Sequence, residues 1–133
     1  MRLSLGAYYA LQALVHLAKQ GHGAAPVASH VIAAERGVPE RFLLKVLRPL
    51  VSAQVLLSLK GPNGGYRLAR PAGKVTLLEV VEAVDGPIRG GAPLRPAGPD
   101  AGLLRRLDQV CGQLAEQVRK GLSRVTLADL AAR

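Results

Sequence analysis

The sequence predicts a mainly α-helical chain with one small β-hairpin. Aromatic residues make up only 3% of the 133 residues and Trp is absent, so the core must consist of Leu, Val, Ile and Ala, a composition typical of packed helices. Apolar residues also recur at helical spacing along most of the chain. In residues 55–70, by contrast, two short runs flank a glycine-rich centre, which is typical of a hairpin.

The N-terminal segment, residues 4–19, is predicted to form an amphipathic helix that ends at the break in residues 21–23. Its apolar face consists of Ala7, Leu11, Leu14, Val15 and Ala18. The segment contains Gln12 and His16 and is shorter than the roughly 18 apolar residues that a membrane span needs. We therefore expect a buried core helix and no contact with a membrane.

A second helix is predicted from about Ala28 to Arg36, closely followed by a third. Gly37 supplies a sharp turn between them, and Pro39 suits the first position of the third helix. A helix, a short glycine-containing turn and another helix form a helix-turn-helix motif.

The third helix has an apolar face and a cationic face. The apolar face is predicted to contain Phe42, Leu43, Val46, Leu47 and Leu50. Arg41, Lys45 and Arg48 fall on the opposite face. Pro49 lies inside this pattern and removes a backbone hydrogen bond, so we expect a kink or an early end near Arg48.

Residues 55–60 and 66–70 are predicted to form the two strands of a β-hairpin with a glycine-rich tip. Next, Thr76 and Glu79 have the spacing of a capping box, and apolar residues continue that helix to Asp85. Gly86 then ends the helix.

The C-terminal third is predicted to contain a flexible segment followed by a dimerisation helix. Residues 87–102 are rich in Gly and Pro, which is typical of a linker or loop. In residues 103–133, an apolar stripe with coiled-coil spacing precedes a short helix that begins at residues 126–129. The stripe consists of Leu104, Leu107, Cys111, Leu114 and Val118. It predicts a homodimer interface, although so short a stripe could instead pack on its own domain.

The formal net charge of +9 favours polyanionic partners. The order of elements in residues 1–86 is that of a winged helix-turn-helix domain, in which the third helix enters the major groove of double-stranded DNA and the hairpin lies alongside it. Between Val38 and Arg70, six cationic side chains are opposed by Glu40 alone. They are Arg41, Lys45, Arg48, Lys60, Arg67 and Arg70.

These residues predict a division of roles on DNA. Arg41 and Lys45 are expected to meet base edges, and Arg48 a phosphate. In the hairpin, Lys60 and Arg67 are expected to flank the tip, where glycines allow the backbone to approach the duplex closely. Gly64 and Gly65 are the tip glycines that we include in this predicted DNA-binding surface.

Three motifs make the chain similar to a known family: VPERFL in Val38–Leu43, LKGPNGGYRL in Leu59–Leu68, and LEVVEAVDG in Leu78–Gly86. It resembles the Rrf2 family of bacterial regulators, the IscR/NsrR/CymR type, from its opening Met1–Ser4 to its closing Val125–Leu130. The resemblance implies a homodimer that binds a roughly palindromic operator and is regulated through its affinity for DNA, and we expect it to act as a repressor. The single cysteine fits a reducing cytoplasm, where we expect the chain to be located.

The chain departs from the cluster-binding members of that family. They carry three cysteines in the loop that corresponds to about Pro87–Arg105, whereas this chain has none there. A cluster needs several thiolate or imidazole ligands, so we expect no iron–sulfur cluster, no other cofactor and no metal site. The single cysteine, Cys111, is interpreted as a small buried hydrophobic residue, and the three histidines lack metal-ligand spacing.

Two other classes of function were weighed against DNA binding. An enzyme is not expected, because the chain has no phosphate-binding loop, HExxH or GxSxG motif. A winged-helix module that binds proteins without reading DNA is the main alternative, since fold does not establish function. The clustered positive charge argues against it. The sequence leaves open whether a small molecule, a partner protein or redox chemistry at Cys111 regulates the chain.

Overall fold

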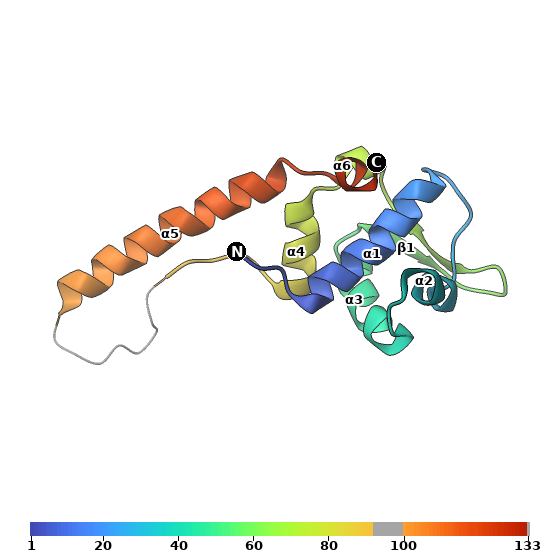
Figure 1. Ribbon diagram of the computed structural model, residues 1–133, viewed down its shortest axis with the longest axis horizontal. Helices are drawn as coiled ribbons and strands as arrows, with labels where there is room; N and C mark the ends of the chain where they lie inside the picture. Colours follow the sequence, from blue (N-terminus) through green and yellow to red (C-terminus); the bar gives the residue numbers. More distant parts are fainter. Residues whose placement is uncertain (92–99, 133) are drawn as a thin grey trace.

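The computed structural model describes residues 1–91 and 100–132. It is mainly helical with one two-stranded antiparallel hairpin, which confirms the predicted fold class (Figure 1). The elements, in order, are α1 (Leu5–Gln20), α2 (Ser29–Arg36), α3 (Glu40–Ser52), β1 (Leu56–Leu59), β2 (Gly65–Leu68), the short 3₁₀ helix η1 (Ala72–Lys74), α4 (Leu77–Asp85), α5 (Ala101–Ser123) and α6 (Leu127–Ala131).

Helix α1 is the central element of the body and contacts α2, α3, α4 and α6. Its buried face includes Ala7, Ala10 and Ala13, whose small side chains let neighbouring helices approach closely. The Ser4 hydroxyl caps the helix by accepting a hydrogen bond from the Ala7 N–H at 3.0 Å. Across the described residues, none of the helices combines the length and apolarity that crossing a bilayer requires.

The helix-turn-helix forms as predicted, but α3 does not end early. Gly37 adopts a left-handed conformation with φ 65° and ends α2, and α3 then continues through Pro49 to Ser52. An interior proline lacks the N–H that would bond one turn back, and its ring crowds the carbonyl there. Because Leu50 beyond it is fully buried in the core, packing holds the last turn of α3 in place.

The hairpin is attached to the body along its second strand. Leu56 of β1 and Leu68 of β2 face each other in the register, and both side chains are buried. Val27, just before α2, pairs with Tyr66 through two backbone hydrogen bonds of 2.9 and 2.8 Å. The wing is therefore joined by backbone hydrogen bonds to the segment that begins the helix-turn-helix.

The C-terminal helix α6 returns to the body. Capping boxes begin both α4, with Thr76 and Glu79, and α6, with Thr126 and Asp129. Two backbone hydrogen bonds tie residues 125–127 to residues 75–77. Leu127 is fully buried, so α6 packs with the N-terminal body and not along α5.

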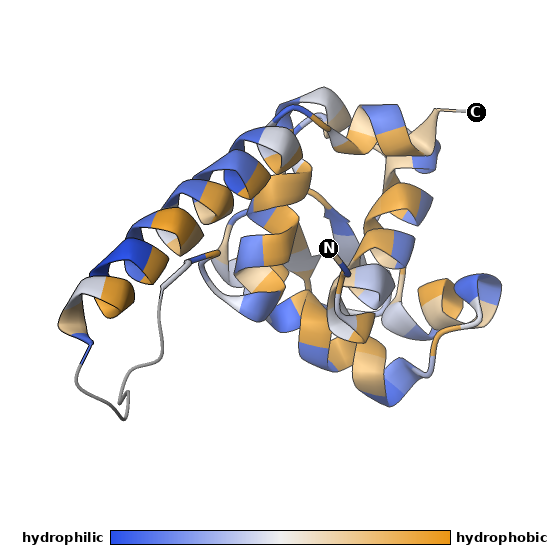
Figure 2. Ribbon diagram, turned by 60° about the vertical axis from the view of Figure 1, so that its left-hand side comes forward, coloured by the Kyte–Doolittle hydropathy of each residue, from blue (hydrophilic) through white to orange (hydrophobic). Residues whose placement is uncertain are grey.

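Helix α5 extends from the body as a long arm (Figure 1). It begins at Ala101, where the Asp100 carboxylate accepts a hydrogen bond from the Leu103 N–H at 2.8 Å. Hydrophilic residues lie along one side of the helix and hydrophobic residues along the other (Figure 2). Within α5 only Leu122, near the end next to the body, is buried.

Candidate nucleic-acid interface

The cationic face of α3 is exposed to solvent. Arg41, Lys45 and Arg48 all lie on it, as the sequence predicts. The opposite face is formed by buried side chains of Leu43, Val46, Leu47 and Leu50, which anchor the helix in the core. Packing therefore fixes the orientation in which α3 presents its positive charge.

Phe42 does not lie in the core, contrary to the prediction. Its side chain is 51% exposed, its ring centroid lies 6.4 Å from that of Tyr9, and the Lys45 ammonium lies 5.5 Å from the Phe42 centroid. At 100° per residue, Phe42 falls on the border between the two faces of α3. There its ring packs on α1 on one side and supports a cation on the other.

Leu44 is an exposed apolar residue that the sequence analysis missed. It is 43% exposed and belongs neither to the core cluster nor to the side chains packed against it. Helical spacing places it one turn after Arg41 and one turn before Arg48. Its position on the cationic face is the signal that could have identified it.

Close packing of the backbone shapes the tip of the wing. A Cβ atom on Gly64 would lie 2.1 Å from the Leu59 carbonyl oxygen, and one on Gly65 would lie 2.4 Å from the Val27 backbone. Gly65 also has a φ of 147°. A side chain at position 64 would therefore clash with the first half of the hairpin, and one at position 65 would force the hairpin away from the segment before α2.

The two cationic residues of the wing differ in their surroundings. Lys60 is exposed at the tip, directly after β1. Arg67 lies inside β2 opposite Leu57, is half-buried, and lines a small recess together with Gly23 and Ala24. The structure thus places Lys60 at the tip and Arg67 farther along the strand.

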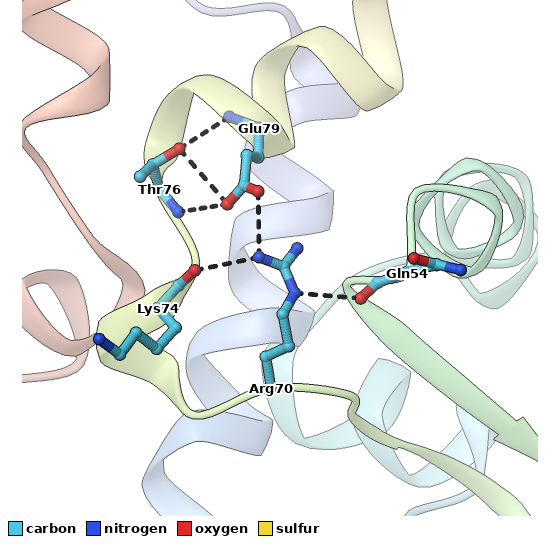
Figure 3. Close-up of polar contacts among 5 residues, drawn as sticks. All are labelled: Gln54, Arg70, Lys74, Thr76 and Glu79. Carbon is cyan, nitrogen blue, oxygen red and sulfur yellow. Dashed lines mark hydrogen bonds and ion pairs between the residues drawn. The ribbon is translucent and has the colours of Figure 1, made fainter.

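Arg70, which we counted with the cationic surface, serves the fold instead. Its guanidinium donates hydrogen bonds to the carbonyls of Gln54 and Lys74, at 3.3 and 3.0 Å, and pairs with the Glu79 carboxylate at 3.0 Å (Figure 3). The other Glu79 oxygen accepts a bond from the Thr76 N–H at 2.8 Å. Arg70 therefore links the base of the wing to the start of α4, and Glu79 neutralises its charge.

The histidines and acidic residues form no metal-binding cluster in residues 1–91 and 100–132. His16 is buried, and its Nε2 lies 3.4 Å from a carboxylate oxygen of Glu35, so this contact joins α1 to α2. His22 and His30 are exposed.

The apolar stripe predicted on α5 is only partly uncovered. Leu107 and Leu114 are exposed, whereas Leu104, Cys111 and Val118 are half-buried. The backbone of Gly90 contacts α5 so closely that a Cβ atom would lie 2.0 Å from the Cys111 carbonyl oxygen. An adjacent exposed stripe consists of Leu103, Leu107, Val110 and Leu114, which are 43–55% exposed.

Comparison with known proteins gives one consistent result. The family model described as "Rrf2: Iron-dependent Transcriptional regulator" matches residues 3–133. Rv1287 of Mycobacterium tuberculosis (strain H37Rv), named as an HTH-type transcriptional regulator, is 36% identical over 98% of this chain and 81% of its own length. The HTH-type transcriptional regulator CymR of Bacillus subtilis is 28% identical over 98% of this chain and 90% of its own length.

Solved structures show the same likeness. The structure of CymR, described as the global cysteine regulator of B. subtilis, is 27% identical and has a TM-score of 0.75, covering 98% of this chain and 96% of that one. An IscR structure from T. potens, at 24% identity and a TM-score of 0.70, shares the fold; it covers 98% of this chain and 85% of that one.

Proposed function

This chain belongs to the Rrf2 family of transcriptional regulators, and on that premise we propose that it is a homodimeric repressor that reads a roughly palindromic DNA operator. It is a regulator and not an enzyme. The observation that supports the proposal best is the exposed cationic face of α3, which the buried face behind it holds in a fixed orientation.

On DNA, we assign base contacts to the first turns of α3 and phosphate contacts to its end and to the wing. Recognition helices present their N-terminal residues to base edges, which gives these roles to Arg41 and Lys45, while Arg48 meets a phosphate. Lys60 at the tip and Arg67 on β2 then contact the backbone, which supplies affinity without sequence preference.

The proposed dimer forms through α5. Four apolar side chains, Leu103, Leu107, Val110 and Leu114, lie exposed on one stripe, and a second copy of the same helix would cover them. This stripe keeps Leu107 and Leu114 from the sequence prediction and shifts the rest of the contact by part of a turn. A two-fold dimer presents both α3 helices to one side of the duplex, so half-sites should lie about one helical turn apart or a multiple of it.

The family is described as iron-dependent, but the donors of this chain do not fit a family-type iron–sulfur cluster. The sequence holds one thiol, Cys111, and no group of three or more metal-binding side chains gathers within the described residues. We therefore propose that the chain regulates without such a cluster.

Iron content tests this part of the proposal directly. Protein purified without oxygen should be colourless and hold no stoichiometric iron or sulfide, because its loop supplies no thiolates. Visible absorption together with metal analysis is the measurement. Iron and sulfide in stoichiometric amounts would show that other ligands replace the cysteines.

A salt titration tests the division of roles on DNA. Arg41→Ala should weaken binding to the operator by about 1–3 kcal/mol with little effect on scrambled duplex. Lys60→Ala should weaken both alike and lower the salt slope by about one unit. Arg106→Ala, on the exposed surface of α5, is a matched control that should change neither.

Two results would contradict these roles. Equal losses on both duplexes for Arg41→Ala and Lys60→Ala would mean that α3 does not read sequence. Failure of the wild type to retain any duplex at low salt would favour the protein-interaction module instead.

A further inference from the structure

The cationic face of α3 has an exposed apolar residue on one flank. Leu44 is 43% exposed, with Arg41 one turn before it and Arg48 one turn after it. The other exposed apolar residue of the recognition turns, Phe42, is already in contact with Tyr9 and Lys45.

Lys45 does not cover Leu44. On the helix, Phe42 and Leu44 lie on opposite flanks of the line through Arg41, Lys45 and Arg48. The Lys45 ammonium lies over the Phe42 ring, 5.5 Å from its centroid, and so leans away from Leu44. The leucine side chain therefore remains accessible between two arginines.

The floor of the major groove offers an apolar partner to such a side chain. The groove is about 12 Å wide, and a helix with its side chains is about 10–12 Å across, so residues on the leading face of α3 meet base edges. Cationic side chains there can bind bases or phosphates through hydrogen bonds and charge, whereas a leucine can make only apolar contacts. The apolar group on the base edges is the C5-methyl of thymine.

We propose that Leu44 is a specificity-determining residue that contacts the C5-methyl group of one thymine in each half-site. This inference rests on the proposed function, in which α3 enters the major groove. It adds a component of sequence reading that the cationic residues do not provide: recognition of a methyl group by apolar contact.

Uracil tests the proposal, because it pairs as thymine does and lacks only the methyl group. The probe is a duplex that the wild-type chain enriches from a random pool, synthesised with thymine or with uracil at each thymine position in turn. Loss of one buried methyl corresponds to about fourfold weaker binding per half-site, or about sixteenfold when both half-sites are changed. We expect this loss at one symmetric pair of positions.

The variant Leu44→Ala should bind the thymine and uracil duplexes with equal affinity. Leu130→Ala, a comparably exposed leucine on α6 at 40%, should keep the full difference. Arg41→Ala should also keep it while binding more weakly overall. Since Leu44 is outside the core, its truncation should leave the fold intact, and circular dichroism checks this.

The outcomes separate this inference from the function beneath it. If the wild type binds its selected duplex but no uracil substitution weakens binding, or if Leu44→Ala remains sensitive to uracil, the role of Leu44 is overturned while DNA binding stands. If no duplex is enriched, the proposed function fails and this inference falls with it.

Discussion

The body built from α1–α4 and the arm formed by α5 differ in how far their apolar side chains are buried. Leu14, Leu43 and Leu47 of the body are completely buried. In α5, Leu122 alone is buried, whereas Leu103, Leu107 and Leu114 are about half exposed. The two regions thus differ in whether their own chain covers their apolar side chains.

The difference indicates where each region obtains its stability. The body buries its apolar surface within one chain and should fold at any protein concentration. The exposed stripe of α5 gains stabilisation only when something covers it, and we propose a second copy. Stability of the arm should therefore depend on protein concentration, and that of the body should not.

The largest effect should come from breaking the dimer. Replacing Leu107 and Leu114 by Asp places two carboxylates in the proposed contact, so the variant should sediment as a monomer. Because each monomer then binds through one half-site only, operator affinity should fall by at least about 10³-fold, towards that of non-specific binding. Sedimentation and DNA titration are the measurements.

A matched control adds the same charge elsewhere on α5. Gln109→Asp with Gln113→Asp introduces two carboxylates outside the apolar stripe. This variant should remain a dimer. If the variant with both Leu107→Asp and Leu114→Asp still sediments as a dimer, α5 does not form the dimer interface.

The next effect compares the same substitution in the two regions. In the monomeric background, Leu47→Ala should lower the free energy of unfolding by about 2–5 kcal/mol, because it leaves a cavity in the core. Leu103→Ala on the arm should change it by less than about 0.5 kcal/mol. Urea unfolding measures both, and equal losses would mean that α5 packs on its own body.

The smallest effect compares polar contacts in the two regions. Glu79→Gln removes the charge that pairs with Arg70 between the wing and α4, and it should lower the free energy of unfolding by about 0.5–1.5 kcal/mol. Glu116→Gln on α5 removes a more exposed pairing with Arg119, at 3.8 Å, and should have almost no effect. Thermal unfolding at matched salt distinguishes the two.

Local sequence signals were sufficient to predict most of the fold. Gly37 and the Thr76 capping box act through backbone conformation or hydrogen bonds a few residues away, and Gly64 lies against the carbonyl of nearby Leu59. We expected a kink or an early end of α3 near Arg48, and the early end was wrong, because burial of Leu50 outweighs the missing bond at Pro49. That burial depends on residues distant in sequence.

The candidate site could be predicted less completely for the same reason. Helical spacing is sufficient to predict the positions of the cationic side chains of α3. The hydrogen bond and ion pair of Arg70, however, depend on Gln54 and Glu79, which meet it only in the folded chain. Likewise, the pattern of α5 could not show which apolar stripe would face the body. In the folded chain, the backbone of Gly90 contacts α5 at Cys111, and Gly90 is distant from Cys111 in the sequence.

The pairing of Val27 with Tyr66 has a consequence for how the molecule opens. Both amides are hydrogen-bonded across the junction between the wing and the segment before α2, so neither can exchange its proton with solvent until that junction separates. The Asn63 amide at the exposed tip should exchange quickly, whereas those of Val27 and Tyr66 should exchange slowly and at similar rates. Wing and helix-turn-helix would then open together, as one cooperative unit.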